Sequence, residues 1–305
     1  MRKLLVLSLI MMVVLSYSGL IYAADGNTAD VIQNNGENEA KVEQTGENEV
    51  KVEQEGKNEA KVKQTGKNKA MIEQLGENKA NLEQNGTGNE AYIVQSSMNI
   101  SLLSTYNVAN VDQIGNRNQA GIMQMGSEND ADIAQDGDKN QAGIMQIGIK
   151  NEAGIAQDGD RNQAGIAQVG TENEADIDQA GDKNKLGIIQ GGDKNEADID
   201  QIGDNNAFLV LQVGEENQIK GVKEGSNGLR LTVNKAAQQY NGSKFLGYQN
   251  GQRNKIGLRQ GKDDLGFIKQ EGSDNMALLR QAGAVSHNTI IKQTGDESKA
   301  KVNQK

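Results

Sequence analysis

Polar and apolar positions alternate along most of this chain in a short unit that returns every eleven residues. Over residues 118–201 most units read Asn-x-Ala-x-Ile-x-Gln-x-Gly-x-x, so the marked residues fall on every second position of an extended strand. This period of two predicts a β-strand, and no apolar stripe at helical spacing competes with it. The four residues after each strand contain a Gly, as a tight corner with positive φ requires.

Repetition of the unit predicts the architecture. Two units form one flat coil of ~22 residues, and coils of this kind stack into a solenoid. We therefore expect an all-β protein, a flattened β-helix or β-solenoid of stacked two-strand coils. Stacked, in-register strands of this kind are also found in amyloid.

The inward side chains of the predicted strands are amides as well as Ala and Ile. Because coils stack at ~4.8 Å, each amide lies above its counterpart in the next coil, where it can both donate and accept hydrogen bonds. The predicted self-assembly ladder consists of Asn118, Gln124, Asn129, Gln135, Asn140, Gln146, Asn151, Gln157, Asn162, Gln168, Asn173, Gln179, Asn195 and Gln201. The predicted corners are Gly126, Gly137, Gly148, Gly159, Gly170, Gly181 and Gly203.

A chain that is only 35% hydrophobic and 3% aromatic would ordinarily be disordered, but the strict repeat predicts a fold in which ladder bonding replaces a bulky core. Pro is absent, as expected for a chain that is nearly all central strand, and the absence of Cys excludes disulfides and thiolate metal sites. Residues 1–23 carry Arg2 and Lys3 before a short apolar run and end in Ile21-Tyr22-Ala23. This pattern predicts a secretory signal peptide and an exported product.

The remainder divides by the regularity of its repeats into three segments of one continuous solenoid. Residues 24–95 use ten-residue units, residues 96–216 use eleven-residue units, and residues 217–305 carry degenerate, basic units. We expect a degenerate strand over Asn99–Thr105 and a longer loop over Asn234–Gly242. Counting two units per coil gives ~13 coils.

Neither terminal unit is followed by a Pro, an amphipathic helix or a bulky charged loop. The predicted terminal edges are Asn27, Gln33, Ser298 and Gln304, and such open edges favour head-to-tail addition of further copies. Residues 25–216 hold 15 basic and 35 acidic residues, whereas residues 217–305 hold 15 basic and 7 acidic residues. The basic end of one copy and the acidic body of the next attract each other, which favours stacking of copies in one direction. Alternatively the basic segment binds anionic polymers non-specifically, but no specific nucleic-acid site is indicated.

The run Gln-x-Gly-x-x-Asn-x-Ala-x-x-x-Gln, seen over Gln124–Gln135 and Gln135–Gln146, resembles the curlin repeat of bacterial curli fibre subunits. That family also uses units that open with Ser, which Ser243 and Ser298 match. The resemblance implies a self-assembling extracellular fibre at the cell surface, a functional amyloid for biofilm matrix, adhesion and aggregation. It also implies a nucleator or major-subunit paralogue, a chaperone and a dedicated secretion pore as partners.

This chain departs from the family's usual form in three ways. It is about twice as long, its first block uses ten-residue units, and it lacks the Gly/Asn-rich segment that normally addresses the secretion pore. The basic C-terminal segment resembles the family's nucleator more than its major subunit, so both roles stay open.

Other function classes find less support in the sequence. The only histidine, His287, occupies an Asn slot, and the carboxylates recur as a corner pattern, so we predict no catalytic, cofactor or metal site and no enzyme. Calcium could bind Gly-Asp-Lys-Asn corners, although the spacing differs from the nonapeptide calcium repeat. The rival interpretation is a surface solenoid that does not polymerise, an adhesin or an ice-binding protein.

Overall fold

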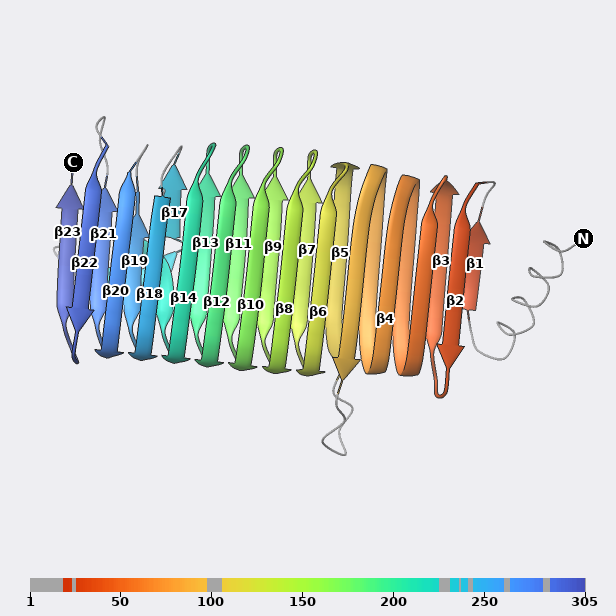
Figure 1. Cartoon of the computed structure of the whole chain (residues 1–305), viewed down its shortest axis with the longest axis horizontal. Coiled ribbons are helices and arrows are strands. Elements are labelled where there is room, and N and C mark those ends of the chain that lie inside the picture. Colours follow the sequence, from red (N-terminus) through yellow and green to blue (C-terminus); the bar gives the residue numbers. More distant parts are fainter. Residues whose placement is uncertain are drawn as a thin grey trace, which may run out of the picture.

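The computed structural model describes residues 19–23, 26–97, 106–224, 231–235, 237–240, 244–260, 264–281 and 286–304. Within these residues the chain forms strands and corners, and no helix is long and apolar enough to cross a membrane. Figure 1 shows the strands side by side across the long axis of a rod. Its two ends carry β1 (Gly19–Ala23) with β2 (Thr28–Asn34), and β22 (Asn288–Thr294) with β23 (Lys299–Gln304).

Two parallel sheets form the broad sides of the rod, and we call their outer surfaces face A and face B. Face A is built by β2, β6 (Gln119–Ser127), β8 (Gln141–Ile149), β10 (Gln163–Thr171), β12 (Lys185–Asp193), β14 (Ala207–Glu215), β18 (Lys244–Gln252), β20 (Leu265–Ser273) and β22. Face B is built by β1, β3 (Glu39–Gly46), β5 (Asn107–Asn116), β7 (Asp130–Asp136), β9 (Glu152–Asp158), β11 (Glu174–Ala180), β13 (Glu196–Ile202), β15 (Gln218–Glu224), β17 (Ala237–Tyr240), β19 (Lys255–Arg259), β21 (Met276–Gln281) and β23. The long strand β4 (Glu49–Ser97) winds through several coils and contributes to both faces.

The register between neighbouring coils follows the sequence repeat. In the regular block Gln119 pairs with Gln141 and Gln141 with Gln163, which is one coil of 22 residues. In the first block Glu39 pairs with Glu59, which is a coil of 20 residues. The predicted fold class, an all-β solenoid of stacked two-strand coils, is confirmed, with about 11 turns.

The corners explain the difference between ten- and eleven-residue units. An eleven-residue corner has two residues at positive φ, such as Gly126 at 116° and Glu128 at 57°. A ten-residue corner, such as the one at Gly46, keeps the Gly at 112° but has no left-handed residue after it. The shorter unit therefore lacks the corner residue with a left-handed backbone, a conformation that is unfavourable for residues other than Gly.

The corner glycines are also required by the next coil. A Cβ added to Gly148 would lie 1.9 Å from the carbonyl oxygen of Gly170, and one added to Gly126 would lie 1.9 Å from that of Gly148. The corners therefore stack backbone on backbone, with no room for a side chain. The regular Gly in the sequence predicts the positive φ but not the close backbone contact between corners, because that contact involves a residue 22 positions away.

Ala and a branched aliphatic residue from each strand fill the space between the sheets. Ala131 and Ile133 of β7 are buried, as are their counterparts in the neighbouring coils. Larger residues enter the Ala slot near the C-terminal end, where the rings of Phe208 and Phe245 lie 4.6 Å apart. Gly266 occupies the same slot in the following coil, and a Cβ there would meet Phe245 at 2.9 Å, so small and large residues compensate.

The prediction of ~13 coils is too high. Asn78 pairs directly with Asn107, so these two residues lie one coil apart in the stack although they are 29 positions apart in the sequence. The predicted strand Asn99–Thr105 lies outside the described residues. A degenerate unit in the sequence is thus compatible with an insertion that leaves the stack unchanged.

A second insertion splits one strand position of face B into two pieces. Gln218 and Ile219 of β15 pair with the start of β13, whereas β17 pairs with its second half, where Gln239 lies opposite Gln201. Between the pieces, β16 (Leu231–Lys235) folds back antiparallel on β15. The predicted loop over Asn234–Gly242 is therefore wrong for residues 234–235 and 237–240, because β15 and β13 supply pairing partners that local sequence does not reveal.

The predicted leader lies mostly outside the described residues, since nothing is described for residues 1–18. Its last five residues form β1, which pairs in parallel with β3 so that Ala23 lies opposite Gln44. This strand occupies the edge of β3 at the N-terminal end of the rod.

Two glycines of one unit offer a matched test of the corner. Gly148→Ala should lower the free energy of unfolding by at least ~2 kcal/mol, because it combines a positive φ with a backbone collision. Gly143→Ala should leave stability unchanged or raise it by ~0.5 kcal/mol, because a Cβ there meets nothing within 4 Å and Gly weakens a strand. Urea unfolding followed by circular dichroism measures both, and equal effects would refute the stacked-corner explanation.

Candidate self-assembly surfaces

The inward Gln side chains form two hydrogen-bonded ladders along the rod. In each step the Nε2 of one Gln donates to the Oε1 of the Gln in the next coil towards the C-terminus, as Gln124 does to Gln146 at 2.9 Å. Under face A the ladder runs without interruption through Gln33, Gln54, Gln74, Gln95, Gln124, Gln146, Gln168, Gln190, Gln212, Gln249, Gln270 and Gln293. Under face B it runs through Gln44, Gln64, Gln84, Gln113, Gln135, Gln157, Gln179 and Gln201, and again through Gln260, Gln281 and Gln304.

The Asn ladders run in the opposite direction. The backbone N–H and Nδ2 of Asn129 both donate to the Oδ1 of Asn107, at 3.1 and 3.0 Å, which is one coil closer to the N-terminus. Steps of this kind, through the backbone N–H, the Nδ2 or both, link Asn118, Asn140, Asn162 and their neighbours on face A, and Asn151, Asn173 and Asn195 on face B. Each Asn therefore bonds the start of its own strand to the start of the equivalent strand in the preceding coil.

The predicted ladder residues are buried, and each belongs to one of these stacks. Gln146, for example, also donates through Nε2 to the backbone oxygens of Asp130 at 2.7 Å and Asn151 at 2.9 Å. A buried amide is favourable only when its polar atoms are paired. The ladders meet most of this requirement by repetition, since each coil supplies the partners that its neighbour needs; among the described ladder amides the buried Nδ2 of Asn184 and the Oε1 of Gln44 have no partner.

The predicted terminal-edge residues are the last members of these ladders. Asn27 accepts from Asn48 at 2.9 Å, and the backbone N–H of Ser298 donates to Asn275 at 3.0 Å. Gln33 donates to Gln54 at 2.8 Å, and Gln304 accepts from Gln281 at 3.0 Å. Each of the four residues is thus bonded on the side that faces the rest of the rod.

At the N-terminal end one ladder atom lacks a partner. The Oε1 of Gln44 is buried and accepts no hydrogen bond from any described residue, although the same atom in the next ladder member, Gln64, accepts from Gln44 at 3.1 Å. An unsatisfied buried polar atom costs ~1–3 kcal/mol. The ladder under face B therefore ends at a buried acceptor without a donor, on the edge of β3 that β1 covers.

Carboxylates at the corners pair with the backbone. The Oδ1 of Asp160 accepts from the backbone N–H of Asp138, and that of Asp182 accepts from Asp160, both at 2.9 Å. The described residues contain no group of three or more His, Cys, Asp or Glu that could hold a metal ion. His287, in an Asn slot, continues the stack by lying 3.0 Å through Nδ1 from Oδ1 of the buried Asp264.

Four segments of the chain match the sequence profile of the Curlin associated repeat family, over residues 107–137, 126–159, 150–181 and 181–214. Residues 107–214 are curlin repeats. They coincide with the strands from β5 to β14, where the ladders are most regular. A search of curated proteins finds no match. Together with the solenoid fold, the curlin repeats indicate a structural rather than a catalytic protein.

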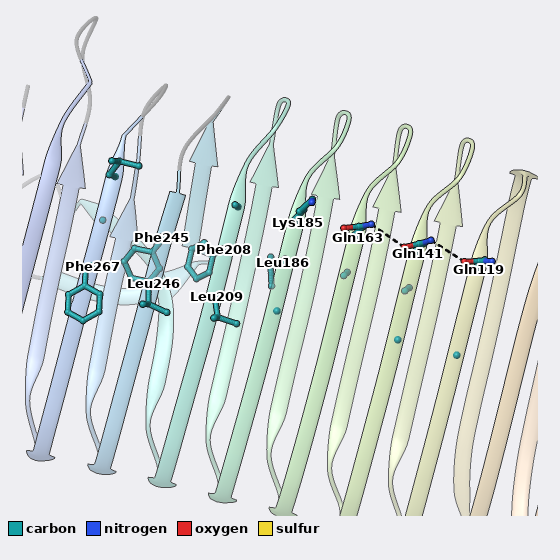
Figure 2. Close-up of a pocket in the computed structure, with 18 of the residues that line it drawn as sticks. Gln119, Gln141, Gln163, Lys185, Leu186, Phe208, Leu209, Phe245, Leu246 and Phe267 are labelled. Carbon is teal, nitrogen blue, oxygen red and sulfur yellow. Dashed lines mark hydrogen bonds between the residues drawn. The ribbon is translucent and has the colours of Figure 1, made fainter.

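Face A and face B of the curlin repeats differ chemically, which sequence reasoning missed. Face A exposes a row of Gly and a row of apolar residues beside the hydrogen-bonded Gln119, Gln141 and Gln163, which Figure 2 shows (3.1 Å between side chains). Face B carries outward carboxylates, of which Glu196 and Asp198 are half-buried and the others exposed: Asp130, Asp132, Glu152, Glu174, Asp176, Asp178, Glu196 and Asp198. Aligning the units at 22 rather than 11 residues reveals this difference, because alternate units lie on opposite faces.

Crowding raises the pKa values of several carboxylates on face B. Burial, followed by repulsion from Glu174 and Glu152, raises the pKa of Asp176 to about 6. Burial and repulsion from Asp200 and Asp176 raise the pKa of Asp198 to about 6. Ionised face B therefore opposes the stacking of its own coils near neutral pH.

Acidification should stabilise the rod through these groups. In an unfolded chain Asp has a pKa of ~3.9. Between ~4 and about 6 the folded rod therefore binds more protons than the unfolded chain, and the free energy of unfolding rises as pH falls. The gain is complete below the unfolded pKa and is lost as pH rises through 6. Asp176→Asn with Asp198→Asn should raise the urea midpoint at pH 7 and flatten its pH dependence, whereas an equally steep dependence would contradict this assignment.

The inward and outward Gln residues of one strand test the buried ladder. Gln146→Ala should lower the free energy of unfolding by more than ~2 kcal/mol, because it leaves a cavity and strands the amides of Gln124 and Gln168. Gln141→Ala removes an exposed ladder member and should change stability by no more than ~0.5 kcal/mol. Comparable losses of urea midpoint in both variants would argue against the buried ladder as the source of stability.

Proposed function

We propose that this protein is the structural subunit of an extracellular curli-like amyloid fibre, in which copies add head to tail to build biofilm matrix and to promote adhesion and aggregation. The observation that carries the proposal is the buried Oε1 of Gln44, which accepts no hydrogen bond from the described residues at the N-terminal end. The C-terminal end offers the matching donor, the Nε2 of Gln304, at the last step of the same ladder.

Stacking one copy on the next continues both sheets in register. In this junction β22 of one copy pairs with β2 of the next, and β23 pairs with β3, so that Gln293 lies at Gln33 and Gln304 at Gln44. The donors point from one copy to the next in the direction that the ladders follow within the rod. Lys299 comes to lie opposite Glu39, which gives the junction one complementary pair on its exposed side.

The edge of β3 becomes available when β1 is removed. β1 belongs to the segment that we propose to be a cleaved secretory leader, and its Ala23 lies opposite Gln44, where an Ala has no side-chain donor. Processing after Ala23 would therefore open an edge that the precursor covers. This coupling supports assembly outside the cell rather than before export.

Export and partners follow from the curlin repeats and the leader-like segment. We propose that the chain is secreted, forms a homopolymer, and works with a chaperone, a secretion pore and a nucleator or major-subunit paralogue. The basic residues 217–305 would add non-specific attraction to anionic polymers. The alternative is a cell-surface adhesin that remains a single rod.

Gln304 and its neighbour Asn303 test the junction, because the same change from amide to carboxylate can be made at an inward and at an exposed position of β23. Gln304→Glu keeps the acceptor for Gln281 but removes the donor for Gln44 and places a carboxylate against its oxygen. We expect it to slow fibre elongation at least tenfold, as measured by thioflavin fluorescence and electron microscopy on the chain lacking residues 1–23. Asn303→Asp lies on the exposed side of the same strand and should change the rate less than twofold.

The unsubstituted chain provides the decisive comparison. Fibres that grow faster when seeded would support the proposal. A rod that stays monomeric at micromolar concentration would refute it and favour the adhesin.

A further inference from the structure

The curlin repeats on face A carry glycines for which a single rod gives no reason. Gly121, Gly143, Gly165 and Gly187 form a row along the rod, one in each of β6, β8, β10 and β12. None has a positive φ, and a Cβ added to Gly121 or Gly143 would meet nothing within 4 Å. Gly within a strand costs stability and often marks a place where another chain approaches closely.

The glycine row is the floor of an open groove. The groove has a volume of ≈1220 Å³ and continues from Tyr92 to Ile290, with Gln119, Gln141 and Gln163 along one edge. Figure 2 shows these side chains on one side and Leu209, Leu246 and Phe267 further along the rod. The groove is therefore deepest where the glycines lie and is filled by larger apolar side chains towards the C-terminal end.

An apolar row lies beside the glycine row, two residues further along each strand. It consists of Met123, Met145, Ala167 and Ile189, and Met123, Met145 and Ile189 are 40%, 37% and 47% exposed. Continuous exposed apolar surface of this kind marks an interaction site. In β6, β8 and β12 the two rows have complementary sizes, since one lacks side chains and the other presents Met123, Met145 and Ile189 at the same spacing along the rod.

We propose that face A binds face A of a second copy, with the apolar row of each rod seated in the glycine row of the other. A two-fold axis parallel to the rods, placed between the sheets and midway between the rows, brings each glycine row opposite the partner's apolar row. In β6, β8 and β12 a large residue then meets a Gly, as Met145 does with Gly143 of the second copy. In β14 and β18 the same operation places Leu209 opposite Leu211 and Leu246 opposite Tyr248 of the second copy, so apolar side chains meet each other there.

The size of face A suits such a pair. At ~4.8 Å per strand and ~3.3 Å per residue, the strands from β6 to β22 present a surface of ~40 by ~20 Å, which is ~800 Å² per copy. This is the area that each partner contributes to a standard stable interface. Sheets pack face to face at ~10 Å, a separation that interdigitated Met and Ile side chains fill.

Face B cannot replace face A in this pairing. It carries Asp132, Glu174 and Asp176 and their acidic neighbours, and two such faces would repel each other near neutral pH. The pair is therefore closed at two rods, with the acidic faces in solvent. In the proposed fibre this gives a filament of two parallel rods, an inference that rests on the proposed function, whereas the pairing itself requires no growth.

Crossed thiol linkages test the pairing in the full-length chain, which has no Cys of its own. Gly143→Cys and Met145→Cys copies, mixed and treated with a short bis-maleimide that spans the ~10 Å between packed sheets, should form a 143–145 crosslink more often than either copy forms with itself. Asp132→Cys and Ala134→Cys copies present the same spacing on face B and should form none. Equal crosslinking on both faces, or none on face A, would overturn the proposal.

Filling the groove tests the same geometry in fibres. Unsubstituted fibres should have twice the mass per unit length of a single rod, and Gly143→Leu with Gly165→Leu should halve it while leaving elongation unchanged. Unsubstituted fibres with the mass of one rod would refute pairing but not the proposed function. A chain that forms no fibres would contradict the proposed function, and the crossed thiol linkages would still decide whether two rods pair.

Discussion

Burial of the side-chain amides is the constraint on which the rest of this structure depends. An amide inside a thin core is tolerated only if its neighbours satisfy it, and here the neighbours are the same residue one coil away. This requirement fixes the register of every strand, since a slip by one residue would exchange the inward and outward side chains. It also limits the corners to glycines that let coils approach at the strand spacing.

Much of the fold follows from the sequence because the repeat is local. The alternation of Asn118, Ala120, Ile122 and Gln124 predicts the strand and its inward side, and the spacing of Gly126 predicts the corner. The number of coils and the split strand position around β15 and β17 do not follow, because pairing across an insertion is decided by the edge that the stack presents. The candidate ladder was found from the same local pattern, whereas the buried acceptor of Gln44 appears only with the three-dimensional stack.

The division into two faces is a property of the coil rather than of the unit. Each coil contains two units, one whose strand lies on face A and one whose strand lies on face B. Residue types that recur in every second unit therefore gather on one face and give it a uniform chemical character. Apolar and glycine rows on one side and carboxylates on the other give the rod different partners on its two sides. Raised pKa values on the acidic side make its repulsion sensitive to pH, while the apolar side does not titrate.

The opposed directions of the Asn and Gln ladders have an electrical consequence. Aligned amide dipoles sum along an α-helix to a macrodipole with partial charges at its ends. In this rod the Gln amides point towards one end and the Asn amides towards the other, so their contributions along the axis offset each other as coils are added. The ladder amides therefore add little net dipole of their own, and the electrical polarity of the rod comes from its acidic body and its basic C-terminal segment.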